Sequence, residues 1–118
     1  MFGTAATQSV FLILGSTDMR KSIDTLALQL HTLKNVPNIF NGGLFVFCNR
    51  RKTIIKILYW DRNGFCLWQK RLDKTYFDWP KSEEQIKNMQ IRELRWLLDG
   101  LKLDTISARG DFSPKLVC

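Results

Sequence analysis

The sequence predicts an α+β fold: a small antiparallel β-meander sheet with one main helix packed on a face and a second, C-terminal helix. Three observations predict it. Apolar residues recur at helical spacing from Met19 to Leu33, three strand-like runs fill residues 44–72, and a short amphipathic segment begins at Ile91. A helix laid across one face of a twisted antiparallel sheet is the economical way to bury these surfaces.

The first helix is predicted from its apolar stripe. A short apolar strand over residues 9–14 precedes it and stops at Gly15. Ser16 or Thr17 can cap the helix, with Asp18 favourably placed against the positive end of its dipole. Asn35 and Pro37 end it. The stripe has spacings of four, three, four and three residues and consists of Met19, Ile23, Leu26, Leu30 and Leu33.

Three strands of a meander follow the loop at residues 41–43. The run 44–48 is continuously apolar, as expected for a strand buried on both faces. Residues 53–60 and 65–72 form the next two strands. The connection between them ends in Gly64, which we expect in the left-handed conformation that such a tight loop needs.

Beyond the meander the pattern weakens. The aromatic residues at 76, 77 and 79 predict a short edge strand, which Pro80 cannot continue. Ser82 and Gln85 have the spacing of a capping box, so a helical turn is expected to begin there. The last helix should run from Ile91 to about Asp99, with its leucines inward and Gly100 as its stop.

The length of 118 residues predicts one domain over 1–104, with 1–8 as a flexible lead-in and 105–118 as a mobile tail. No apolar run approaches the roughly 20 residues that cross a bilayer. The three cysteines form no Cys-x-x-Cys pair. We therefore expect a cytoplasmic protein without disulfides.

Charge gives the first functional indication. The chain carries 18 Lys and Arg against 11 Asp and Glu, a net charge of +7. Between residues 50 and 74 there are eight basic residues and two aspartates, so most of the excess lies in the meander. Such a positive field attracts nucleic acid, although a basic face can also serve solubility alone. Basic side chains on a sheet can neutralise phosphates, and exposed aromatic rings beside them can stack on unpaired bases.

No constellation of catalytic residues is evident. His31 is the single histidine, so neither a zinc site nor a histidine-based nucleophile is expected, and no cofactor motif occurs. Four aspartates could serve a two-metal nuclease, but nothing in the sequence makes them converge: they are Asp18, Asp24, Asp61 and Asp73. We expect a protein that is not an enzyme, with no catalytic residues and no bound metal.

The same segments carry a family resemblance. They are TDMRK at 17–21, GLFVF at 43–47 with NRR at 49–51, IKILYWD at 55–61 with GF at 64–65, LW at 67–68 and KRL at 70–72, then Phe77, WP at 79–80 and LLDGL at 97–101. In this order they resemble the short accessory protein of the insertion sequence 66 family of bacterial transposable elements, often called TnpB. The resemblance implies a role in DNA transposition beside a separate, larger transposase that carries the cutting and joining chemistry.

Two hypotheses follow. In the first, the protein binds DNA, largely without sequence preference, through Arg50, Arg51, Lys52, Lys56, Lys70 and Arg71. In the second, it is an adaptor that docks on the transposase or another protein of the element through Asp18, Met19 and Arg20. A small nuclease that uses Asp18, Asp24 or Asp61 is a third possibility.

Overall fold

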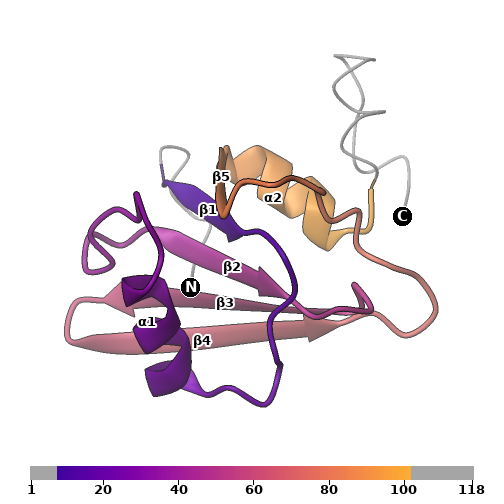
Figure 1. Cartoon of the computed structure of the whole chain (residues 1–118). Coiled ribbons are helices and arrows are strands. Elements are labelled where there is room, and N and C mark those ends of the chain that lie inside the picture. Colours follow the sequence, from indigo (N-terminus) through magenta and orange to yellow (C-terminus); the bar gives the residue numbers. More distant parts are fainter. Residues whose placement is uncertain (1–7, 102–118) are drawn as a thin grey trace.

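A mixed sheet forms the centre of the computed structural model, which describes residues 8–101 (Figure 1). Its strand order is β4-β3-β2-β1-β5, and every neighbouring pair is antiparallel except β1 and β2. The strands are β1 (Val10–Ile13), β2 (Leu44–Cys48), β3 (Ile54–Asp61), β4 (Gly64–Arg71) and β5 (Ile86–Met89).

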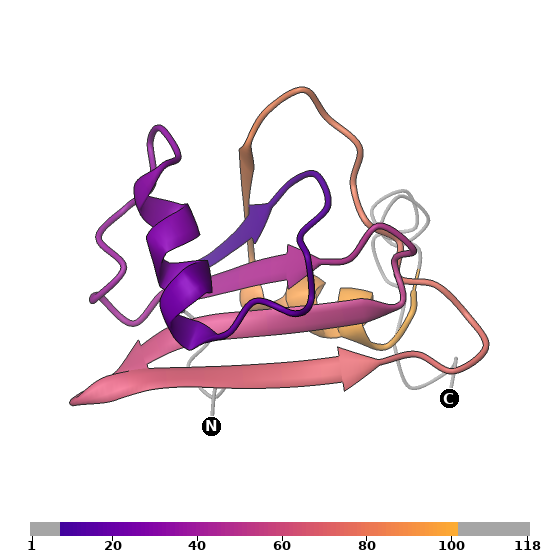
Figure 2. The same ribbon diagram turned by 60° about the horizontal axis from the view of Figure 1, so that its bottom comes forward.

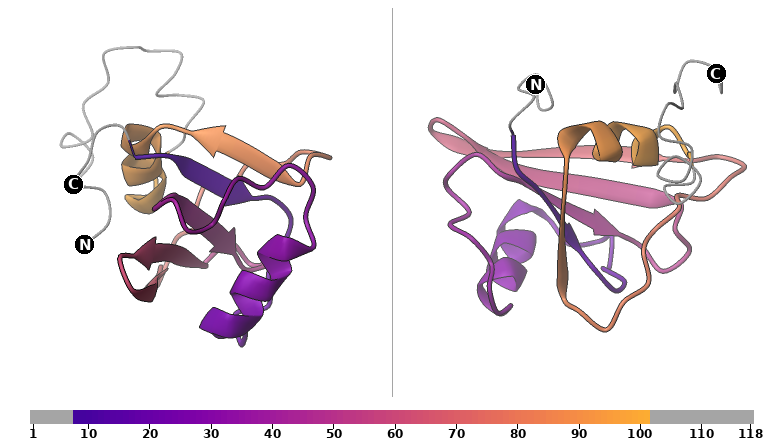
Figure 3. Two further views of the ribbon diagram at one scale, coloured as in Figure 1. Left: turned by 90° about the vertical axis from the view of Figure 1, so that its left-hand side faces the viewer. Right: turned by 90° about the horizontal axis from the view of Figure 1, so that it is seen from above.

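The two helices cover opposite faces of this sheet, as the edge-on view in Figure 3 shows. Leu26 and Leu30 of α1 (Ile23–His31) pack on one face, and Leu94 and Leu97 of α2 (Ile91–Leu98) pack on the other. All five residues of β2 are buried because β2 lies under both layers. This confirms the predicted central strand and the α+β class.

The predicted meander is confirmed as β2-β3-β4, and β3 and β4 form the long hairpin at the lower edge of Figure 2. The expected strand boundaries are within one residue of the observed ones. The turn expectation was wrong in one respect: Arg62, with φ of 53°, takes the left-handed conformation, and Gly64 instead opens β4.

Helix α1 is shorter than predicted and begins at Ile23, six residues after Thr17. Its N-cap is Ser22, which makes no side-chain cap hydrogen bond. Residues 14–22 instead form an irregular connection with a turn at Met19 and Arg20, and Met19 still packs against the α1 face of the sheet. The predicted stripe therefore is correct as a buried face, although only its middle part is helical.

The edge strand lies elsewhere than predicted. Residues 76–80 are irregular, with the rings of Phe77 and Trp79 buried in the α2 side of the core. The edge strand is β5, which pairs with β1 in the region where a helical turn was expected. The last helix is confirmed: α2 ends at Leu98, and Gly100 follows with φ of 81°. The expected lead-in, apart from Gln8, and the tail 105–118 lie outside the described residues.

Candidate nucleic-acid interface

The turn between β2 and β3 is held in place by the side chain of Asn49. Its Oδ1 accepts hydrogen bonds from the backbone N–H groups of Thr53 (2.9 Å) and Ile54 (3.0 Å), and its Nδ2 donates to Thr53 Oγ1 at 3.1 Å. Lys52 occupies the left-handed region with φ of 62°. The basic residues between Asn49 and Thr53 are therefore presented on a fixed loop.

Five basic residues gather at this end of the sheet, and we call them the basic surface. Arg71 lies opposite Ile54, beside the turn, because β4 pairs with β3 in that register. Lys81 lines the same pocket as Arg50 and Lys52. Four of the five are exposed and Lys52 is half-buried; the members are Arg50, Arg51, Lys52, Arg71 and Lys81.

Lys81 was missed by the sequence-based reasoning. It lies 29 positions beyond Lys52, and nothing in the local pattern links the two. The link is tertiary: the backbone N–H of Phe77 donates to the Lys52 carbonyl at 2.8 Å, which brings the segment with Lys81 beside the turn.

Lys56 does not belong to the basic surface, which corrects the sequence-based set. Only 8% of it is exposed, and its Nζ donates to the backbone carbonyls of Met19 (2.7 Å) and Lys21 (3.0 Å). A buried ammonium must find such acceptors because an unpaired buried charge is costly. Lys56 thus fastens the connection before α1 to β3 and leaves no ammonium free for a phosphate.

Lys70 is the second correction. Its Nζ donates to the carbonyl of Leu98, the last residue of α2, at 2.8 Å. A cation there satisfies a free carbonyl and complements the negative end of the helix dipole. Lys70 therefore holds α2 against the sheet, whereas its neighbour Arg71 points to the other face and is exposed.

The aromatic residues of the meander do not interleave with these cations. Phe45 and Phe47 are buried in the core. The rings of Phe40, Trp60 and Phe65 form a cluster near the β3–β4 turn, with centroids 5.0 to 5.6 Å apart. That turn lies at the opposite end of β3 from the basic surface, so these three rings do not lie beside the basic residues.

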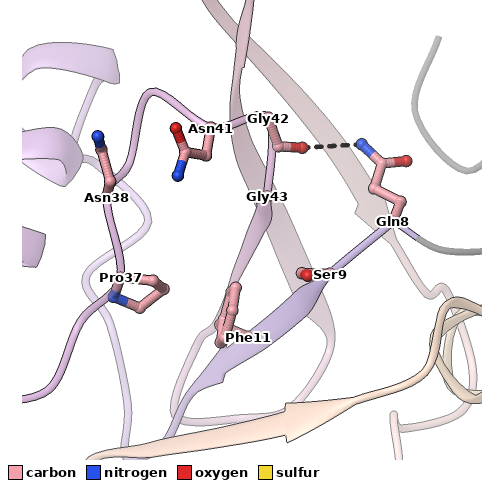
Figure 4. A pocket seen from close by; sticks show the side chains of 8 residues that line it. All are labelled: Gln8, Ser9, Phe11, Pro37, Asn38, Asn41, Gly42 and Gly43. Carbon is pink, nitrogen blue, oxygen red and sulfur yellow. Dashed lines mark hydrogen bonds between the residues drawn. The ribbon is translucent and has the colours of Figure 1, made fainter.

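Two pockets mark the two ends of the sheet. The pocket at the basic end has a volume of about 260 Å³, and its lining includes Arg50, Lys52 and Lys81 beside Trp79 and Pro80. The pocket at the start of β2, about 230 Å³, is shown in Figure 4, where Gln8 Nε2 donates to the Gly42 carbonyl at 2.9 Å. Its lining contains no charged side chain. Only the first pocket is therefore suited to an anion.

Asp18, Met19 and Arg20 are arranged differently from a docking cleft. The Arg20 guanidinium binds the Asp18 carboxylate through Nη2 at 2.7 Å and through Nε at 3.1 Å to both oxygens. The backbone N–H of Arg20 donates to the same carboxylate at 2.9 Å. Met19 is half-buried between them and packs inward. The two exposed charges of the triplet thus satisfy each other.

This pair predicts an acidic titration for Asp18. The Arg20 side-chain hydrogen bonds, followed by the Arg20 backbone N–H, lower the Asp18 pKa from 3.8 to about 2. Because the folded pKa is depressed, the contribution to stability is complete above pH 3.8 and is lost as the pH falls toward 2. We expect an NMR titration of the Asp18 carboxyl to give a midpoint near 2 and Arg20→Gln to move it back toward 3.8. Equal midpoints in the two proteins would contradict the pairing.

The remaining candidates for chemistry are dispersed. Within residues 8–101, no three His, Cys, Asp or Glu side chains gather closely enough to hold a metal ion. Burial raises the pKa of the Cys48 thiol to about 12, which keeps it protonated at neutral pH. No helix in the described part of the chain is long and apolar enough to span a bilayer.

These features define a class: a small α+β protein whose sheet ends in an exposed basic surface beside a cation-lined pocket. The family of IS66 Orf2-like proteins, TnpB_IS66, matches residues 8–108, and the chain belongs to this family. It is therefore an accessory protein associated with a transposable element, as the resemblance implied.

One relative is an uncharacterized protein, y4hO, of Sinorhizobium fredii. It is 36% identical over 92 residues, which cover 78% of this chain and 79% of the relative. No solved structure matches the chain.

Proposed function

We propose that this protein is a non-catalytic accessory factor of DNA transposition that binds DNA phosphates through its basic surface. The observation that carries the proposal is the convergence of Arg50, Arg51, Lys52, Arg71 and Lys81 at one end of the sheet. Within the described residues, these side chains form no ion pair, so their charge is available to an external anion.

The expected binding has little sequence preference. Phosphate contacts fix position without reading sequence, and base readout normally needs an element that enters a groove. Both helices pack on the faces of the sheet, whereas the basic surface lies at the end of the sheet and consists of loop and strand residues. The protein would thus add affinity or shape to a complex in which the transposase supplies the chemistry.

Binding of a labelled DNA duplex across a salt series tests this function. If all five cations contact phosphates, the log-log slope of affinity against salt should be about −4.5, because each contact contributes roughly 0.9. Duplexes of unrelated sequence should give the same slope. Absence of binding at low salt would contradict the proposal.

The adaptor hypothesis has less support in the geometry. Asp18 and Arg20 satisfy each other's charge, and Met19 packs inward. Its distinct prediction is co-purification with the transposase that persists after nuclease treatment. That outcome, together with a flat salt series, would favour an adaptor.

A further inference from the structure

The pocket at the basic end is lined by more residues that can donate hydrogen bonds than a flat cationic face would offer. Three cationic side chains line it, Arg50, Lys52 and Lys81, together with the hydroxyls of Ser16 and Ser82 and the indole of Trp79. No Asp or Glu is among the residues that line it. The site therefore offers hydrogen-bond donors with a positive charge and no competing carboxylate.

Trp79 adds an independent observation. It is 6% exposed, and its Nε1–H has no hydrogen-bond partner within the described structure. Buried donors are almost always satisfied, so an unpartnered donor on a residue that lines a cationic pocket suits an acceptor that arrives with a ligand. Ser82 Oγ accepts from the backbone N–H of Glu84 at 3.0 Å, which leaves the hydroxyl hydrogen free to donate.

The pocket is built before any ligand arrives. Three chain segments form it, and backbone hydrogen bonds join them. Thr17 N–H donates to the Cys48 carbonyl at 2.8 Å, and Phe77 N–H donates to the Lys52 carbonyl at 2.8 Å. Asn49 fixes the turn between these two bonds. Because little ordering remains to be done, a small anion can bind without a large entropic cost.

We infer that this pocket binds the phosphate monoester at the end of a nucleic-acid strand. A monoester carries close to two negative charges at neutral pH and three free oxygens. A phosphodiester inside a strand has a single charge and two free oxygens. It would therefore leave more of the three cations and three neutral donors unpaired than a monoester would. This inference deepens the proposed function, since it rests on DNA as the ligand of the basic surface and adds recognition of the strand end.

The Trp79 indole N–H resonance gives a readout that does not depend on duplex binding. We would titrate the ¹⁵N-labelled full chain with inorganic phosphate, with 5′-phosphorylated dithymidine and with unphosphorylated dithymidine. The first two should shift the Trp79 signal, because Trp79 lines the pocket that the phosphate enters. The unphosphorylated dinucleotide should bind about tenfold more weakly or worse, as expected for the loss of a charge-assisted hydrogen bond.

Two lysine variants complete the test. Lys81→Gln should weaken the phosphate response about tenfold, whereas Lys87→Gln, at an exposed position of β5 outside the pocket, should leave it unchanged. Equal binding of the two dinucleotides, or a response in Lys81→Gln equal to that of the unaltered protein, would overturn the inference. A response to inorganic phosphate alone would overturn it too, because the site would then be a small-anion site.

Failure of the strand-end inference and failure of the proposed function give different results. A normal salt series without a preference for the phosphorylated dinucleotide would leave the proposed function standing and remove the strand-end site. A phosphate-dependent Trp79 shift without duplex binding would keep the site and remove the extended DNA surface.

Discussion

Replacement of Lys56 with methionine should lower the free energy of unfolding by about 2–4 kcal/mol. The substitution keeps the unbranched stem and removes the ammonium, which is 8% exposed and donates to the carbonyls of Met19 and Lys21. Each lost charge-assisted hydrogen bond leaves a carbonyl without its partner, and water reaches it only in part. The connection before α1 should also loosen, because these two bonds fasten it to β3.

Urea denaturation followed by tryptophan fluorescence measures this effect. Lys70→Met is the matched control, since it removes one hydrogen bond at the end of α2 and should cost about 1–2 kcal/mol. A Lys56 variant as stable as the unaltered protein would show that the ammonium is not structural. Lys56 would then return to the residues available to DNA.

Reversal of Arg50 and Arg51 to glutamate should weaken DNA binding on the order of a hundredfold at moderate salt, since each lost contact is worth roughly tenfold. Both side chains are exposed on the fixed turn, so the fold should be unaffected. The loss should be the same on every DNA sequence, because phosphate contacts carry no sequence information. Fluorescence anisotropy with three unrelated duplexes measures it.

The matched control reverses two arginines at the other end of the sheet. Arg62 lies in the β3–β4 turn and Arg92 in the first turn of α2, and both are exposed. The double variant Arg62→Glu, Arg92→Glu changes the net charge by the same amount. If it weakened binding as strongly as the Arg50, Arg51 variant, the affinity would follow net charge and not the basic surface.

The elements predicted best from the sequence are those with local and strong patterns. The continuous apolar run of β2 marks a strand covered on both faces, and the leucines of α2 have helical spacing. The start of α1 could not be predicted in this way. The Lys56 ammonium, more than 30 positions away, binds the carbonyls of Met19 and Lys21 and fixes the connection that stands where the first helical turn was expected.

The position of the edge strand also could not be predicted from the sequence, because it depends on contacts between distant residues. The segment Ile86–Met89 becomes a strand because it pairs with β1, which lies more than 70 positions earlier in the chain. Phe77 and Trp79 alternate like strand residues, yet both rings enter the core from an irregular segment. Of the six basic residues predicted to bind DNA, the four in or beside the exposed turn remain candidates. The other two, Lys56 and Lys70, donate hydrogen bonds to backbone carbonyls that only the tertiary structure brings close to them.

The most direct test of the basic surface is the difference in salt slope between the unaltered protein and the Arg50→Glu, Arg51→Glu variant. Loss of two phosphate contacts should reduce the log-log slope by about 2, while the Arg62→Glu, Arg92→Glu control keeps the original slope. Equal slopes in the unaltered protein and the Arg50, Arg51 variant would contradict the account, because the turn would then make no contact with DNA phosphates.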